Sequence, residues 1–353
     1  MNPTWEKFCT DLLSLGDLLE DEITPRDELT QAEGMRYLVR LLRYATINCV
    51  EYTDPRYPAF SSAPNPNMAT KIGADNPDNV YQRANISGAY RYRISGTRGT
   101  VPLLTFGSRA NRYHIDGTMR QTGDLHGDDL VLDELGRFSF IASVEQPESG
   151  TWLPLEPDSN LISVRQTYGD RRTELLADLT IECLDPRGEV EPLDTAEIGS
   201  RLSQAVGMVR GTASTFLEWS RRFQPDANTI TAQDQSFYQG AGGDPSIFYL
   251  HGYWRLAENE AWVIRTEVPE CEYYNFVLQN FWLESLDFQR AQTYLNNRTA
   301  TLDDDGRLTI VVAATDPGFG NWISTDGHTE GTWALRWIKA DSHPIPTAEV
   351  VTL

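Results

Sequence analysis

The feature that most constrains the fold is a resemblance between two distant stretches of the chain. Leu132–Ile141 (LDELGRFSFI) aligns with Leu302–Val311 (LDDDGRLTIV). In each copy a Trp lies 16 residues after the Gly, and an Arg follows that Trp by 13 or 14 residues. These residues are Trp152, Trp322, Arg165 and Arg336. An aromatic residue, Tyr90 or Trp262, precedes the Gly by 46 or 44 residues. This spacing predicts two copies of one β unit, and the alternative is that Asp-x-x-Gly-Arg hairpins are common and recur by chance.

Both copies consist of short segments separated by Gly and Pro turns, as is typical of β-sandwiches and jelly rolls. Apolar residues at spacings of three and four indicate helices within 3–20, 35–45 and 194–223, and Thr30–Glu33 and Asp194–Glu197 fit the capping-box pattern. We therefore predict a mainly β chain (α+β) with two jelly-roll-like β-sandwich units that arose by tandem duplication. Its parts are N-terminal helices (1–52), an extended Pro-rich connection over the surface of the next unit (53–79), a first β unit (80–193), a helical insert with a Gly-rich loop (194–246) and a second β unit (247–353).

The charge balance limits the partners of the chain. Its 353 residues include 30 Lys and Arg against 51 Asp and Glu, a formal net charge of −21. The basic footprint that nucleic acids and anionic membranes require is missing, so neither is an expected partner. The four Cys are far apart and form no CxxC pair, which argues against a zinc site or disulfides. The chain has no secretory leader pattern and no 18-residue apolar run, so a cytoplasmic location is expected.

Four stretches of the chain resemble one bacterial family. The most specific is Asp316–Gly327 (DPGFGNWISTDG), and the others are Tyr274–Trp282, Asp75–Tyr81 and Ala32–Leu38. They resemble the family that carries the domain of unknown function twelve-fourteen, and the resemblance covers most of the chain. It implies a jelly-roll-like β fold, similar at the level of fold to tandem jelly-roll glycan amidases. It implies no particular catalytic residues.

Acid–base chemistry is predicted for the second β unit. Glu284 and Asp287 follow an aromatic strand, where burial beside rings would raise the pKa of a carboxyl group and let it protonate a leaving group. His251 lies among aromatic residues and is the candidate base, with a buried core histidine as the alternative. Asp75 and Asp78 are further acid–base candidates, with an Asx turn as the alternative.

Arg336 is the candidate anchor for an anionic group. It alternates with Leu335 and Trp337, so its side chain is expected to face a cleft, where an Arg would bind a carboxylate or a sulfate. The equally favoured alternative is a buried Arg–Asp bridge within the sandwich. The other candidate substrate-binding residues are mostly aromatic: Tyr81, Tyr253, Trp254, Tyr274, Asn280 and Trp282.

These observations favour binding of an organic small molecule or glycoside in an aromatic cleft between the two β units. The expected chemistry is metal-independent acid–base hydrolysis or elimination by a lyase, without a cofactor. The first alternative is a non-catalytic ligand-binding or scaffolding module. The second is a metal-dependent enzyme that uses His114 and His126 with a carboxylate. Acidic β-rich proteins of this size often associate, so a homo-oligomer is also considered, although the sequence shows no interface.

Overall fold

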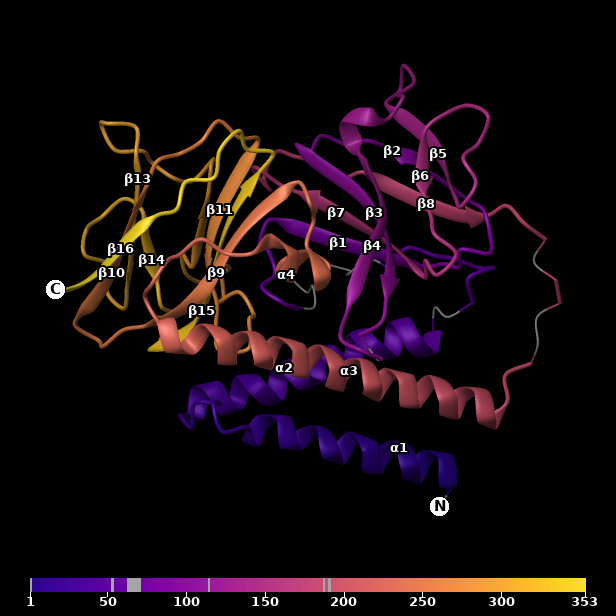
Figure 1. The fold of residues 1–353 in the computed structure, drawn as a ribbon, viewed down its shortest axis with the longest axis horizontal. Helices are drawn as coiled ribbons and strands as arrows, with labels where there is room; N and C mark the ends of the chain where they lie inside the picture. Colours follow the sequence, from indigo (N-terminus) through magenta and orange to yellow (C-terminus); the bar gives the residue numbers. More distant parts are fainter. Residues whose placement is uncertain (1, 52–53, 62–70, 114, 187, 190–191) are drawn as a thin grey trace.

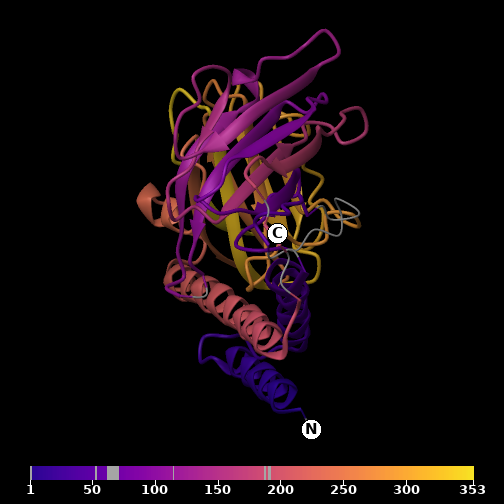
Figure 2. The same ribbon diagram turned by 90° about the vertical axis from the view of Figure 1, so that its right-hand side faces the viewer.

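The computed structural model describes residues 2–51, 54–61, 71–113, 115–186, 188–189 and 192–353. Figure 1 shows two β units side by side, with the N-terminal helices and the long helix α3 (Thr195–Phe223) in a layer along one side of both. In the turned view of Figure 2, this helical layer again lies on one side of the β units. The helical insert predicted between the two β units is thus part of a layer that spans them.

The first β unit has eight strands in two four-stranded sheets. The strands are β1 (Asn79–Asn85), β2 (Tyr92–Thr97), β3 (Leu103–Asn111), β4 (Met119–His126), β5 (Arg137–Ser143), β6 (Trp152–Pro154), β7 (Leu161–Thr167) and β8 (Asp178–Cys183). We call the sheet of order β1-β7-β3-β4 sheet A and the sheet of order β6-β5-β2-β8 sheet B. A cluster of buried apolar residues that includes Tyr92, Phe106, Phe140 and Val164 draws on both sheets.

The second β unit repeats this topology strand by strand. Its strands are β9 (Ile247–Arg255), β10 (Glu260–Thr266), β11 (Tyr273–Leu278), β12 (Tyr294–Asn296), β13 (Leu308–Ala313), β14 (Trp322–Ser324), β15 (Glu330–Ile338) and β16 (Thr347–Thr352). Sheet C has the order β12-β11-β15-β9, and sheet D has the order β14-β13-β10-β16. Adding eight to each strand number of the first unit reproduces both pairings. The prediction of a mainly β chain with two related sandwich units is confirmed.

The sequence motif that revealed the repeat forms the same turn in both units. Gly136 and Gly306 have positive φ angles of 71° and 80° and donate their N–H groups to the carbonyls of Asp133 and Asp303. The strand pairing makes Tyr92 the counterpart of Trp262, since Tyr92 lies opposite Ala142 and Trp262 opposite Val312. The expected counterpart, Tyr90, was therefore wrong by two residues. Of the hairpin predicted at 132–142, only the second arm is a strand.

The helices follow the predicted periodicity, with differences at their ends. The helical segments are α1 (Pro3–Leu13), the 3₁₀ segment η1 (Ser14–Glu20), α2 (Glu28–Thr46), the π segment η2 (Ile47–Glu51), η4 (Gly127–Asp129), α3, η5 (Gln224–Asp226) and α4 (Gln235–Gly240). Asp194 caps α3 as predicted by accepting a hydrogen bond from the Glu197 N–H. For α2 the capping box at Thr30 was wrong: Asp27 is the cap and accepts from the Thr30 N–H, so the helix starts one turn earlier.

The central strands of sheets A and C, β3 and β7 and β11 and β15, are mostly buried on both faces. On β9, Leu250 and Trp254 pack into the sandwich core, whereas Ile247, Tyr249 and Tyr253 pack into a second cluster together with the helices. The expectation that the Pro-rich connection lies over the surface is wrong for its last part, because residues 74–80 are buried. Where a face of these sheets is covered by the helices or the other unit, polar side chains on that face lie beside a gap in the packing.

Replacing Gly34 of α2 by Ala is expected to destabilise the protein by about 1–3 kcal/mol. Ala normally stabilises a helix relative to Gly by about 1 kcal/mol. Here the new Cβ would lie 2.5 Å from Cζ2 of Trp282 and 2.8 Å from Cδ2 of Leu19, so the packing of α2 against the second unit has to shift. Gly16→Ala is the control, because its Cβ would meet no atom within 4 Å. Thermal unfolding measures both variants, and a Gly34→Ala variant as stable as the parent would contradict the prediction.

Candidate functional site

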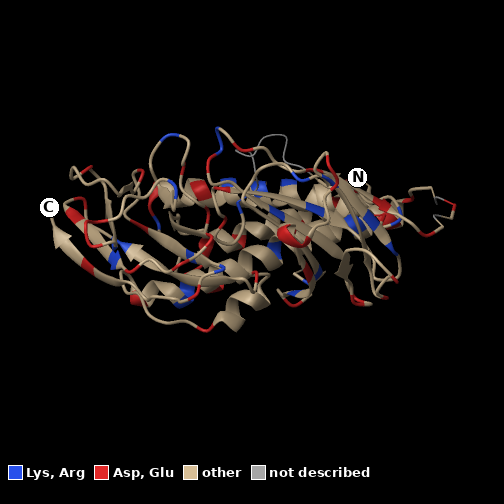
Figure 3. Cartoon of the chain, turned by 90° about the horizontal axis from the view of Figure 1, so that it is seen from above, with Lys and Arg blue, Asp and Glu red and all other residues tan. Residues whose placement is uncertain are grey.

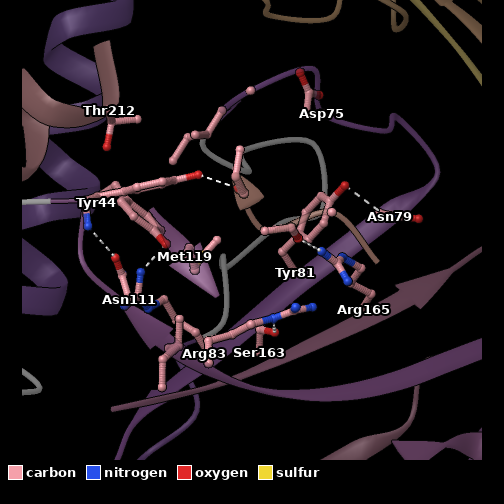
Figure 4. A pocket seen from close by; sticks show the side chains of 18 of the residues that line it. Tyr44, Asp75, Asn79, Tyr81, Arg83, Asn111, Met119, Ser163, Arg165 and Thr212 are labelled. Carbon is pink, nitrogen blue, oxygen red and sulfur yellow. Dashed lines mark hydrogen bonds between the residues drawn. The ribbon is translucent and has the colours of Figure 1, made fainter. Parts of the chain in front are cut away.

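A cavity of about 630 Å³ lies where the outer faces of sheets A and C meet the helices. Its walls come from β1, β3 and β7 of the first unit, from β9 and β15 of the second, and from α2, η2 and α3. The volume is in the range of small-molecule sites in proteins. Figure 4 shows part of this cavity, with Tyr81, Arg165 and Ser163 from the first unit across from Tyr44 and Thr212 of the helices.

Much of the cavity wall is aromatic. The aromatic residues that line it are Tyr44, Phe60, Tyr81, Tyr113, Phe216, Trp219, Tyr238 and Tyr249. Such rings offer a large apolar surface with hydroxyl groups at its edge, which suits a ligand that is flat and mostly apolar. Most of the aromatic residues that line the cavity differ from those predicted for an aromatic cleft between the units.

The polar part of the wall is cationic. Among the described residues that line the cavity, five are Arg and two are acidic: Arg43, Arg83, Arg109, Arg165, Arg336, Glu51 and Asp75. The chain as a whole carries a net charge of −21. Figure 3 shows Asp and Glu on many of the outer loops and Lys and Arg on strands near the middle of the molecule. The lining of the cavity thus has more Arg than acidic residues, whereas the chain as a whole is acidic.

Two Tyr–Arg pairs occupy equivalent places in the two units. Tyr81 on β1 lies opposite Arg165 on β7, and Tyr249 on β9 lies opposite Arg336 on β15. All four line the cavity. Both Arg residues recur at the end of the repeat seen in the sequence, so the duplication itself places two guanidinium groups in one cavity.

Each Arg is held by a loop from the other unit. Arg165 donates to the carbonyl of Gly242 at 2.7 Å and to Oδ2 of Asp244 at 3.0 Å. Arg336 donates to the carbonyl of Ala74. Ala74 lies two residues before Asn76, as Gly242 lies two residues before Asp244. The two loops form the same hydrogen bonds. Asn76 Oδ1 accepts from the N–H of Asp78, and Asp244 Oδ1 accepts from the N–H of Ser246. Tyr81 and Tyr249 in turn accept from the N–H groups of Asn76 and Asp244.

The two Arg sites differ in charge. Burial alone would raise the pKa of Asp244, but the charge of Arg165 and hydrogen bonds from Ser246 outweigh it and lower that pKa. Asp244 is therefore ionised and neutralises Arg165. At the matching position stands Asn76, which is uncharged. Among the described residues, no carboxylate forms an ion pair with Arg336, whose other hydrogen bond goes to Asn275 Oδ1 at 3.4 Å.

His251 lines the same cavity next to Arg336. Burial lowers the pKa of His251 well below its ordinary value, and the positive charge of Arg336 lowers it further. The ring is therefore neutral near neutral pH, and its Nδ1 atom has no hydrogen-bond partner among the described residues. Arg83 holds the equivalent position in the first unit, two residues after Tyr81, and its Nε atom likewise has no partner among the described residues. Both groups can still form a hydrogen bond with a ligand.

Three of the ten predicted site residues line the cavity: Tyr81, His251 and Arg336. The predicted catalytic set is not assembled, which corrects the sequence-based prediction. Glu284 is 1% exposed and accepts from Arg40 of α2 at 2.6 Å, outside the cavity. Burial does raise the pKa of Glu284, with Arg40 opposing the shift. Asp287 pairs with Arg290 at 2.7 Å in a partly exposed turn.

The other predicted substrate-binding residues are part of the packing. Tyr274 and Trp254 lie in the core between sheets C and D, and Tyr253 donates to Glu330. Asn280 and Trp282 lie in the loop on which α2 packs: Trp282 donates to the carbonyl of Thr30 at 2.9 Å. The sequence does not show which side chains a second element of the fold covers.

Asp75 and Asp78 are both buried, with different surroundings. Asp75 lines the cavity and accepts from the N–H and the hydroxyl of Ser285 at 2.8 Å each. Asp78 crosses to the second unit and accepts hydrogen bonds from Tyr273, Tyr294 and Asn296. The Asx turn expected here is made by Asn76.

The metal alternative is only partly described by the structure. His114 lies outside the described residues, and His126 lies 3.6 Å from Asp124. Elsewhere in the described ranges, no group of three or more His, Cys, Asp and Glu residues is placed to hold a metal ion. Within the same ranges, none of the helices combines the length and apolar composition needed to cross a bilayer.

Most of the cationic wall was not predicted from the sequence. Arg83 and Arg109 lie on strands of sheet A with their side chains buried, at 8% and 1% exposure. Burial lowers the pKa of Arg109 to about 10, and the nearby charge of Arg165 adds to this effect. Only Arg165 had a signal in the sequence, as the repeat counterpart of Arg336.

Two solved structures are similar to this chain. An uncharacterized protein from Burkholderia cenocepacia is 42% identical, with a TM-score of 0.94 over 99% of this chain and 96% of that chain. A protein from Vibrio parahaemolyticus is 12% identical, with a TM-score of 0.52 over 90% of this chain and 96% of that chain, which is a likeness of fold alone. No protein-family model and no curated protein matches the chain.

Proposed function

The chain belongs to the family of the uncharacterized Burkholderia cenocepacia protein, and from that premise we propose that it binds an organic small molecule in the cavity between its two β units. The observation that carries the proposal is the cavity of about 630 Å³, lined by aromatic rings and by unpartnered polar atoms of His251 and Arg83. Buried polar atoms without partners are costly, and a ligand that completes their hydrogen bonds would remove that cost. Membership of the family with domain twelve-fourteen and a cytoplasmic location remain predictions.

The proposal is for binding rather than for the acid–base hydrolysis or lyase chemistry predicted from the sequence. Of the predicted catalytic set of His251, Glu284 and Asp287, only His251 lies in the cavity, and of the further acid–base candidates Asp75 does. Its low pKa fits a neutral hydrogen-bonding group as well as a base. Binding is favoured over scaffolding because the cavity is a formed site of the size that small molecules occupy.

A cavity-filling variant tests the proposal. Thr212 of α3 lines the cavity, so Thr212→Phe should fill part of the ligand space and weaken binding by about tenfold or more. Calorimetric titration with naphthylacetate and with naphthylacetamide, two ligands of one shape, measures the effect, and native mass spectrometry detects any ligand that copurifies. Ser214→Phe is the matched control, because Ser214 lies on the same helix and is exposed. If both variants bound the probes like the parent protein, the cavity would not be the site.

A further inference from the structure

We infer that the ligand of this cavity is an organic carboxylate with an apolar body, and that Arg336 binds its carboxylate. The inference rests on the proposed function and deepens it by naming the class of ligand. Its basis is a comparison that the molecule itself provides: the two units place equivalent Arg residues in one cavity, but only one of them has a carboxylate beside it.

The Arg165 site shows how the fold satisfies a buried guanidinium at this position. One N–H donates to a backbone carbonyl of the opposite loop, and another donates to the carboxylate of Asp244. The Asp244 side chain is only 9% exposed, so the pair is shielded from water. An Arg–carboxylate pair of this kind is the favoured partner arrangement for a buried guanidinium.

The Arg336 site has the hydrogen bond to a backbone carbonyl but, among the described residues, lacks the neighbouring carboxylate. Arg336 donates to the carbonyl of Ala74, as Arg165 does to that of Gly242. Where Asp244 would stand there is Asn76, whose Oδ1 accepts from Asn275 instead. Arg336 is 5% exposed, so water compensates its charge poorly. Its guanidinium has five N–H donors, and the two hydrogen bonds described for it go to uncharged oxygens.

The surroundings of Arg336 suit the rest of such a ligand. His251 lies on the neighbouring strand, is neutral near neutral pH, and has an Nδ1 atom free for a second hydrogen bond. Tyr249 and Trp219 also line the cavity, and both rings pack against the His251 ring, so the wall near Arg336 and His251 is aromatic and suits an apolar body. Arg109 also lines the cavity, but its guanidinium already donates to Gln121 and to Ser163 within its own sheet.

The experiment compares naphthylacetate with naphthylacetamide, which share one shape and carry a charged carboxylate and an uncharged amide, respectively. The parent protein is expected to bind the carboxylate about tenfold or more tightly than the amide, the effect of one charge-assisted, bidentate contact. In Arg336→Gln the preference should fall to within about twofold, while the affinity for the amide stays nearly constant. Asn76→Asp should abolish the preference as well, because it places a carboxylate beside Arg336 as Asp244 lies beside Arg165. This second variant keeps Arg336 and carries the test if Arg336→Gln does not fold.

Arg109→Gln is the control for a general field in the cavity. It removes a buried positive charge but should keep most of the preference for the carboxylate. Equal loss in Arg109→Gln and Arg336→Gln would overturn the assignment to Arg336, and so would equal affinity of the parent protein for both probes. Either result would leave the proposed binding function standing. Binding of neither probe would remove the proposed function, and the carboxylate assignment with it.

Discussion

Replacing Asp78 by Ala is expected to lower the free energy of unfolding by about 3–5 kcal/mol, the largest effect we predict for one side chain. Asp78 is 2% exposed and joins the two units. Its carboxylate accepts from Tyr273 at 2.8 Å, from Tyr294 at 2.9 Å and from Asn296 at 2.6 Å. Removing it leaves three donors unpaired in the interior, and each unpaired donor costs about 1–3 kcal/mol.

The charge of Asp78 is not the source of this stability. Burial raises the pKa of Asp78, and the three hydrogen bonds together with Arg171 offset that shift only in part. The carboxylate thus contributes as an acceptor that three donors require, and Asp78→Asn should also destabilise, because its NH₂ group would face donors. Ser246→Ala is the matched control: Ser246 holds the equivalent position in the second unit and bonds only locally, to Asp244. Urea unfolding of the three variants measures the effects. A loss below about 1 kcal/mol for Asp78→Ala would contradict this account of how the units are joined.

Replacing Glu33 by Ala is expected to destabilise the protein by about 3 kcal/mol, because Glu33 is the buried acceptor between α2 and the second unit. Its Oε2 atom accepts from Asn280 at 2.8 Å and lies 3.0 Å from Nε2 of His328, and its Oε1 atom accepts from Arg36 at 2.7 Å. The side chains of Glu33 and His328 are 9% and 6% exposed. Arg36→Ala is the control, and since Arg36 is half exposed its loss should cost under about 1 kcal/mol.

The same pair predicts a dependence of stability on pH. Burial alone would lower the pKa of His328, but the hydrogen bond and charge of Glu33 outweigh it and raise that pKa. Burial alone would raise the pKa of Glu33, but the hydrogen bond and charge of His328 lower it. The contribution of His328 to the free energy of unfolding is therefore complete below about pH 6.5 and is lost as pH rises through its raised folded pKa. The contribution of Glu33 to the free energy of unfolding is complete above about pH 4.5 and is lost as pH falls through its lowered folded pKa.

Chemical unfolding of the parent protein and of His328→Gln, at pH values from 5 to 9, measures this dependence. The stability advantage of the parent protein over His328→Gln should be greatest between about pH 5 and 6.5 and should shrink at higher pH. A constant difference across the range would mean that His328 is not ionised in the folded protein, and the pair would then be an ordinary hydrogen bond.

Several features of the fold were predictable because they depend on neighbouring residues. The turn at Gly136 and Gly306 and the period of α3 each involve residues within a few positions of one another. Such local patterns also carry the duplication, since both units use the same turn and the same spacing to the following Trp. The bounds were less accurate: the start of α2 depended on Asp27, whose capping role competes with that of Thr30.

The membership of the cavity was only partly predictable. Arg336 was found because it alternates with core residues along its strand, and alternation indicates that a side chain faces away from the sandwich core. Tyr81 was named as an aromatic residue of the Asp75–Tyr81 stretch. Trp282, Asn280 and Glu284 were also predicted for the site but lie beneath α2, which is more than two hundred residues away in sequence. Alternation shows that a side chain leaves the core of its own sandwich, and it does not show what lies on the other side.

By itself the sequence determined the two β units with their shared turn and spacing and the helices between and before them, and it singled out Arg336 as a candidate. Only the tertiary structure decided that the outer faces of sheets A and C meet beneath the helices, and that the loops before β1 and β9 each reach the Arg of the opposite unit. The physical reason is one of range. Hydrogen-bonded turns and amphipathic periods are set by residues close in sequence, whereas a cavity between two units depends on which buried faces pack together. The difference between Asn76 and Asp244 is visible in the sequence, but its consequence for Arg336 follows only from that packing.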